Sequence, residues 1–265
     1  MNAPTASNAR RSRLVGRGRP PRRVLVALVV LAGLVVLLVI ADRVAERVAA
    51  RATAEELRTS QHLAADPDVR FTGFPFLTQA LRGRLDEVDL TASDVATPVV
   101  PLARLQTRLH GVRAGLGAAL AGRLQSVPVD SADASASVRY ADLNPLVATR
   151  LSGTAVGSSL RDPVLADRNG QLAVTAQAAV LGASVPVEVD CDVTVDDTGI
   201  AVVPRRARLP LLGDQALPLA VSTQAAVRVP TQGLPFGFHV RGVTVGPDEL
   251  EVSGDSAGFV ATSPG

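Results

Sequence analysis

The chain of 265 residues has no tryptophan and no lysine, and it has one tyrosine, one cysteine and six phenylalanines. Because Cys191 is the single cysteine, an intramolecular disulfide and a zinc site built from cysteines are excluded. Its segment, VEVDCDVTV, alternates as a strand does, so we expect a buried structural thiol. The neighbouring Asp190 and Asp192 would raise the pKa of that thiol, which argues against a reactive thiolate.

Motifs of the common enzyme classes are also missing. We identify no nucleophile elbow, no P-loop or dinucleotide-binding glycine pattern, and no HxH or HExxH spacing among the histidines. We therefore expect a protein that is not an enzyme, with no catalytic residue, no metal and no cofactor. One alternative is a hydrolase whose catalytic residues are dispersed along the chain and form no recognisable motif.

The charges are distributed unevenly along the chain. Residues 1–23 hold seven arginines and no acidic residue, which leaves 20 arginines against 25 aspartates and glutamates in the rest. The net charge of +2 therefore comes from this segment, and the remainder is acidic, with a net charge of −5. Since the remainder offers no basic face, we expect no nucleic-acid partner.

Residues 24–41 form a run of 18 residues without a charged or polar side chain. As a helix the run would extend about 27 Å, enough to cross the hydrocarbon core of a bilayer. The alternative is a signal peptide, whose apolar region is shorter and is followed by a cleavage site. The arginines before the run place the N-terminus in the cytoplasm. We predict a single-pass protein of the cytoplasmic membrane with its C-terminal domain outside, or a domain secreted to the cell envelope if the segment is cleaved.

This interpretation divides the chain into four parts. They are an Arg-rich cytoplasmic tail (1–23), a transmembrane anchor or signal segment (24–41), an extracytoplasmic domain (42–254) and a flexible tail (255–265).

Residues 42–65 have the pattern of a helix that continues from the membrane and ends before Pro67. A narrow apolar stripe could pack on a sheet, with Asp42 and other charged residues on the remaining faces. The stripe consists of Ala41, Val44, Ala45, Val48 and Ala52. A solvated stalk is the alternative.

Beyond Pro67 the apolar residues recur at every second position, which is typical of strands with one buried face. Strands are predicted at 86–92 and 104–112, a three-stranded meander at 171–209 and a hairpin at 236–254. A helix is predicted at 140–151, whereas 115–124 is ambiguous between helix and loop. We predict an α+β fold dominated by strands. A long helix packs on a curved, mostly antiparallel sheet that forms an elongated apolar groove or half-barrel, its concave face lined by Val, Leu and Ala.

Five of the six phenylalanines lie in two short motifs, FTGFPFL (71–77) and LPFGF (234–238), and each motif leads into alternating sequence. In the first, Gly73 permits a tight bend and Pro75 restricts Phe74 to an extended conformation. Either motif could be a core plug, which is the role we favour for Phe71. Paired aromatic corners could instead line an apolar cavity or dip into a bilayer interface.

Three blocks resemble the LmeA-like family of actinobacterial phospholipid-binding envelope proteins: GFPFLTQALRGRLDEVDLTASDV (73–95), YADLN (140–144) and LPFGFHVRGVTV (234–245). The resemblance extends over roughly residues 44–254. It implies a cell-envelope protein with an N-terminal membrane signal or anchor that binds phospholipid without catalysis. Lipid transfer is a wider form of the same hypothesis. The alternative function is an accessory protein that stabilises a membrane glycosyltransferase of envelope glycolipid synthesis.

Within the matching motifs, the residues that we expect to contact lipid are Phe74, Phe76, Leu77, Leu81, Arg82, Arg84, Phe236 and Phe238. Arg82 or Arg84 would meet the lipid phosphate, and Arg205, Arg206 and Arg208 form a rival basic cluster. Either group could equally be a solvated strand end. The expected partners are phospholipid, the cytoplasmic membrane and, under the alternative function, an enzyme of glycolipid synthesis.

Overall fold

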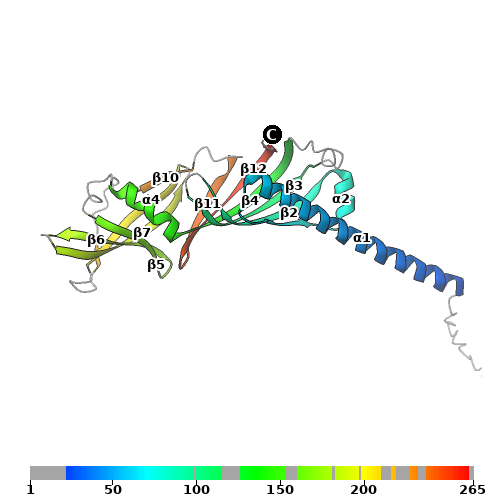
Figure 1. Cartoon of the computed structure of the whole chain (residues 1–265), viewed down its shortest axis with the longest axis horizontal. Coiled ribbons are helices and arrows are strands. Elements are labelled where there is room, and N and C mark those ends of the chain that lie inside the picture. Colours follow the sequence, from blue (N-terminus) through cyan, green and yellow to red (C-terminus); the bar gives the residue numbers. More distant parts are fainter. Residues whose placement is uncertain are drawn as a thin grey trace, which may run out of the picture. The chain divides into compact units, whose positions relative to one another are not determined.

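The structure is a computed structural model of the chain (Figure 1). It describes residues 22–97, 100–114, 126–152, 160–180, 183–196, 198–209, 216–218, 227–231 and 237–262. The ambiguous segment 115–124 and Phe236 lie outside these ranges. The chain divides into two units, Met1–Ala41 and Asp42–Gly265, which are considered separately.

Three helices occur in the described ranges: α1 (Arg22–Gln61), α2 (Phe76–Arg82) and α4 (Tyr140–Ser152). The strands described are β1 (Asp68–Thr72), β2 (Leu85–Val95), β3 (Leu102–Val112), β4 (Ser126–Arg139), β5 (Leu160–Arg168), β6 (Gln171–Val180), β7 (Ala183–Asp196), β8 (Gly199–Arg208), β9 (Ala216–Pro218), β10 (Val227–Pro230), β11 (His239–Val245) and β12 (Glu249–Thr262). The fold is α+β and rich in strands, as predicted.

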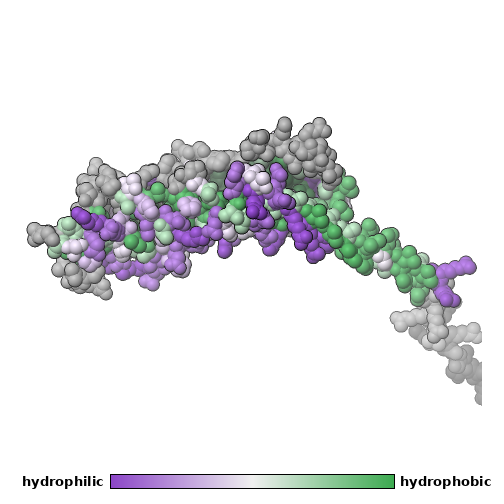
Figure 2. All heavy atoms as spheres, viewed as in Figure 1, coloured by the Kyte–Doolittle hydropathy of each residue, from purple (hydrophilic) through white to green (hydrophobic). Residues whose placement is uncertain are grey.

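The first unit contains the apolar part of α1, and α1 is the one helix in the described ranges that is long and apolar enough to cross a membrane. Its Val, Leu and Ile side chains are exposed, and they form the hydrophobic surface drawn in green in Figure 2. Exposure of so many apolar side chains fits a single-pass anchor or a signal sequence.

The strands of the second unit form two antiparallel sheets, whereas one curved sheet was expected. Sheet A has the strand order β1-β2-β3-β4-β12-β11, and sheet B has the order β10-β8-β7-β6-β5, with β9 beside β8. The predicted meander is β6 to β8 and the predicted hairpin is β11 and β12. Asn169 and Gly170 both have positive φ in the turn before β6, as a tight hairpin requires.

Each strand of sheet A alternates between a polar and an apolar face, which confirms the period-two prediction. One row of register partners on the polar face is charged: Arg70, Asp89, Arg108, Asp133 and Asp255. The adjacent row, on the opposite face, is apolar or small: Val69, Leu90, Thr107, Ala134 and Gly254.

Each sheet has a helix on its apolar face. On sheet A, Ala54 of α1 is buried in a cluster with Val69, Val88, Val112 and Val129. On sheet B, the core cluster contains Tyr140 of α4, Leu165, Leu172 and Cys191, with Val245 and Leu250 of sheet A packed against it. The two sheets therefore share apolar packing where the β11–β12 hairpin meets sheet B.

The packed face of α1 differs from the predicted stripe. Val44 and Val48 are 52% and 61% exposed, whereas Asp42 is 3% exposed. Ala50 and Ala54, four residues apart, face the sheet instead, because alanine allows a closer approach than valine. The predicted stripe is therefore wrong, and so is the solvated stalk.

Candidate functional site

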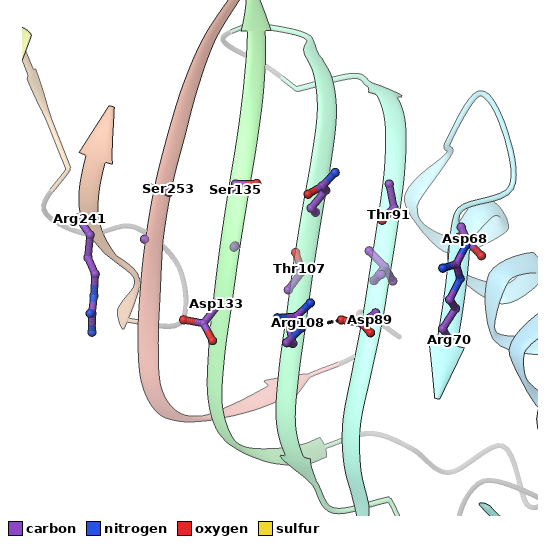
Figure 3. A pocket seen from close by; sticks show the side chains of 14 residues that line it. Asp68, Arg70, Asp89, Thr91, Thr107, Arg108, Asp133, Ser135, Arg241 and Ser253 are labelled. Carbon is purple, nitrogen blue, oxygen red and sulfur yellow. Dashed lines mark hydrogen bonds and ion pairs between the residues drawn. The ribbon is translucent and has the colours of Figure 1, made fainter. Parts of the chain in front are cut away.

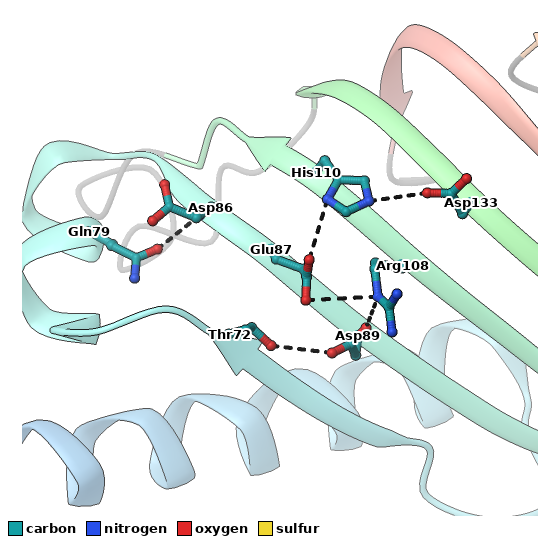
Figure 4. Close-up of polar contacts among 8 residues, drawn as sticks. All are labelled: Thr72, Gln79, Asp86, Glu87, Asp89, Arg108, His110 and Asp133. Atoms are coloured by element: carbon teal, nitrogen blue, oxygen red, sulfur yellow. Dashed lines mark hydrogen bonds and ion pairs between the residues drawn. The ribbon is translucent and has the colours of Figure 1, made fainter.

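The segment FTGFPFLTQALR, residues 71–82, forms the aromatic corner between β1 and β2. Gly73 has φ +110°, and a Cβ placed on it would lie 2.3 Å from the side-chain nitrogen of Gln79. Backbone conformation and close contact both require glycine at this position. Gln79 is buried, and its side-chain oxygen accepts a hydrogen bond of 2.8 Å from the N–H of Asp86, drawn in Figure 4. Gln79 thus fixes α2 to the start of β2.

The two phenylalanines beside Pro75 differ in environment. Phe76 is buried, and its ring centroid lies 5.3 Å from that of Phe71. Phe74 is exposed, and the guanidinium of Arg43 lies 5.2 Å from its ring centroid. Packing therefore makes Phe76 a plug of the core and leaves Phe74 on the surface with Leu77 and Leu81, which are also exposed.

Asp42 of α1 caps α2 across the corner. Its Oδ2 accepts a hydrogen bond of 3.1 Å from the N–H of Phe76, and its Oδ1 accepts one of 2.7 Å from the N–H of Leu77. Because Pro75, the residue before the helix, makes no side-chain cap, this carboxylate satisfies two N–H groups that the helix leaves unpaired. Sequence patterns missed Asp42, since the first charge after an apolar run is usually solvated.

The two arginines at the end of α2 differ in their partners. Arg84 forms an ion pair of 2.7 Å with Asp130, whose carboxylate also pairs with Arg113. Arg82 is exposed, and it has no ion pair with any residue that the structure describes.

The second aromatic motif lies at the other side of sheet A. A Cβ on Gly254 of β12 would lie 2.7 Å from Cε1 of Phe238, so this ring packs closely on the apolar face. Strands β2, β3 and β4 separate β12 from β1. The structure therefore does not bring Phe238 beside Phe76, and a common lipid site for the two motifs stays a prediction. Phe236, outside the described ranges, cannot be placed in it.

The apolar face between the two motifs is half-buried. The partly exposed residues there are Leu90, Leu105, Leu109, Ala134, Ala136 and Val252. Most of these side chains are small or medium in size. Within the described residues, this part of the apolar face therefore remains partly accessible to solvent.

The polar face of sheet A contains a hollow of about 570 Å³, shown in Figure 3. All of its lining residues come from the six strands of this sheet, so the sheet itself bends around it. Alternation assigns side chains to faces, but it does not determine the direction in which a sheet bends. The predicted apolar groove thus remains a prediction.

The charges around this hollow pair across neighbouring strands (Figure 4). Arg108 Nε lies 2.8 Å from Asp89, and His110 lies between Glu87, at 3.5 Å, and Asp133, at 3.1 Å. The hydrogen bond to Asp89, followed by its charge, raises the pKa of Arg108. Such cross-strand pairs account for these residues structurally.

Cys191 lies on β7, where a second hollow of about 480 Å³ is lined by residues of β6, β7 and β11 and the turn before β6. Burial, and then the charges of Asp190 and Asp192, raises the pKa of this thiol to about 12. Cys191 is buried, which confirms the predicted buried thiol.

One segment does match the G-x-S-x-G pattern, GDSAG at 254–258. It lies within β12, and Ser256 is 2% exposed. A nucleophile elbow needs a sharp turn from strand to helix that presents the serine, so this segment is not one. In the described ranges no three His, Cys, Asp or Glu residues are grouped to hold a metal ion.

Comparison with known protein families finds a match to one family model. The family model described as LmeA-like phospholipid-binding matches residues 40–255, which is most of the chain and includes the aromatic corner. No curated protein and no solved structure shows a significant match.

Proposed function

Because the chain belongs to the LmeA-like phospholipid-binding family, we propose that it is a membrane-anchored phospholipid-binding protein of the cell envelope. Residues 24–41 span the cytoplasmic membrane, and the domain from Asp42 onward lies outside the cytoplasm. The domain holds its lipid without catalysis. The seven arginines before the apolar run support this orientation.

The proposed place for the acyl chains is the apolar face of sheet A, between Phe71 and Phe238. The observation that carries this proposal is the partial exposure of Leu105, Ala136 and Val252, three neighbours on this face that do not line the hollow. A hydrocarbon chain laid there would leave water, and each buried CH₂ contributes about 0.8 kcal/mol. The polar face is disfavoured because an acyl chain would desolvate its charges.

The lipid phosphate is proposed to meet Arg82. Arg84 is already paired with Asp130, and in the rival cluster Arg205 and Arg208 are paired with aspartates at 2.6 and 2.9 Å. Arg206 of that cluster is exposed and has no ion pair with a described residue, as is true of Arg82; Arg82 is preferred because it follows the exposed Leu81 of the aromatic corner. An arginine without a carboxylate partner keeps its donors for a phosphate.

Photocrosslinking tests this proposal on the full-length chain. The chain is reconstituted into vesicles that contain a phospholipid with a diazirine in its acyl chain, and crosslinked peptides are mapped by mass spectrometry. We expect crosslinks in residues 24–41 and, separately, in β4 and β12. The span is the internal control for reconstitution. Crosslinks confined to the span would contradict lipid binding by sheet A.

A further inference from the structure

Three large apolar side chains of the aromatic corner are exposed. Phe74 is 57% exposed, Leu77 38% and Leu81 78%. Leu77 and Leu81 are four residues apart and lie on one face of α2, whereas Phe76 and Gln79 on other faces are buried. These three exposed side chains are named the docking patch. A cluster of this kind on a folded domain marks an interaction surface.

The docking patch is held in a defined position by the fold. Phe76 packs on Phe71, Gln79 bonds to the start of β2, and Asp42 caps the first turn of α2. Surfaces that bind a partner need this kind of support from the residues beneath them. A segment that is exposed only because it packs loosely would lack this support from buried residues.

Asp42, the first residue of the second unit, contacts the first turn of α2. Ala41, the last residue of the apolar segment of α1, is bonded to Asp42, and Asp42 binds the N–H of Leu77 at 2.7 Å. The first turn of α2 is therefore within the reach of one aspartate side chain from the end of the segment. This proximity follows from connectivity and hydrogen bonding, whatever direction the segment takes.

Two arginines border the docking patch. The guanidinium of Arg43 lies 5.2 Å from the ring centroid of Phe74 and 3.7 Å from Glu46, and Arg82 follows Leu81 directly. Arg82 has no ion pair with a described residue, whereas the nearby Arg70 and Arg84 are paired with aspartates. Apolar side chains bordered by arginine are typical of segments that lie in the interface of a bilayer with anionic lipids.

Resting on the proposed function, in which residues 24–41 span the bilayer, we propose that the docking patch inserts into the outer surface of that same bilayer. Arg43 and Arg82 then face anionic headgroups, and the edge of sheet A at β1 is held against the membrane. A phospholipid leaving the bilayer would meet the apolar face of sheet A at this edge. The occupant of the docking patch is thus a lipid surface, and neither a protein partner nor a second copy of the chain.

Depth-dependent quenching tests the docking. The full-length chain with Leu81→Cys is labelled with an environment-sensitive fluorophore and reconstituted into vesicles of phosphatidylcholine and phosphatidylglycerol, with or without doxyl-labelled lipid. Val164→Cys, at a valine of β5 that is 44% exposed, is the matched control. The parent chain measures any labelling of the buried Cys191. We expect doxyl lipid to remove most of the fluorescence at position 81 and to leave that at position 164 unchanged.

Two outcomes would overturn the proposal. One is equal quenching at positions 81 and 164. The other is a label at 81 that is shielded from water but not quenched by doxyl lipid, as a protein partner or a second copy would produce. Leu77→Cys repeats the measurement if Leu81→Cys does not fold. Acyl-chain crosslinks in β4 and β12 report lipid binding independently, so their presence without quenching at 81 rejects the docking and leaves the proposed function standing.

Discussion

The two faces of sheet A share the same strands and register, yet they differ in how their side chains are satisfied. On the polar face, Arg108 and its neighbours pair across strands around the hollow. On the apolar face, Val88 and Val129 are buried in the cluster that includes α1, but Ala134 and Ala136 at the centre are partly exposed. The charges of the polar face are thus paired with one another, whereas in the proposed function the apolar face is the one that lipid covers. Substitutions can address each face separately.

Disrupting the packed edge of the apolar face should have the largest effect. Phe76→Ser removes the buried ring that contacts Phe71, and loss of a buried phenylalanine costs about 3–5 kcal/mol. We expect a correspondingly large drop in the free energy of unfolding, measured with urea. Phe74→Ser, two residues away and exposed, is the control and should change it by less than about 0.5 kcal/mol. Equal losses would show that both rings belong to the core.

Filling the centre of the apolar face should come next. Ala136→Phe places a ring where an acyl chain is proposed to lie, between Leu105 and Val252. Displacing two CH₂ groups, at about 0.8 kcal/mol each, should lower lipid affinity roughly tenfold. Ser135→Phe, at the preceding residue of the same strand, places the ring on the polar face, in the hollow. Acyl-chain crosslinking should fall for the first variant and not for the second; a fall in both, or in neither, would contradict the assignment of faces.

Removing a charge from the polar face should have a smaller effect. Asp89→Asn weakens the pairs with Arg108, at 2.8 Å, and with Thr72, at 3.2 Å. Because these side chains are partly solvent-exposed, we expect a loss of at most about 1 kcal/mol in the free energy of unfolding. Lipid crosslinking should stay at the level of the parent chain. A marked loss of crosslinking would indicate that the polar face takes part in binding.

The smallest effect should be on the pH dependence of stability, through Asp255 on the polar face of sheet A. The hydrogen bond from Arg241, then its charge and that of His239, lowers the pKa of Asp255. The folded pKa is thus below the unfolded value of about 4, so the stabilisation is present above that pH and is lost as the pH falls through the lowered pKa. The parent chain should be slightly more stable than Asp255→Asn at neutral pH. The urea midpoints of the parent chain and of Asp255→Asn should converge as the pH is lowered. For the control Ser253→Ala, the difference in midpoint from the parent chain should not change with pH.

Much of the fold could be predicted from local pattern. Strict alternation around Val88 and Leu109 places charged and apolar residues on opposite faces, and that alternation does not depend on distant residues. The helix at 140–151 and the turn at Asn169 and Gly170 are likewise encoded in short stretches. These elements agree with the structure because local sequence determines them.

Features that depend on contacts between distant residues could not be predicted. The carboxylate of Asp42 binds N–H groups 34 and 35 residues away, and no spacing rule connects the two segments. The burial of Phe76 and the exposure of Phe74 depend on the orientation of α2 against β1, which the composition of GFPFL does not encode. The division of the strands into two sheets and the direction of bending are likewise tertiary properties.

Asp42 is both the first residue after the apolar run and a residue of the folded domain, so there is no flexible tether between them. The reach of a tethered domain grows roughly with the square root of its linker length, and here that length is zero. If the run is an anchor, the domain cannot swing away to collect or deliver cargo at a distant surface. Its radius of action is set by its own dimensions, and any acceptor has to arrive by lateral diffusion in the same membrane or approach within that radius.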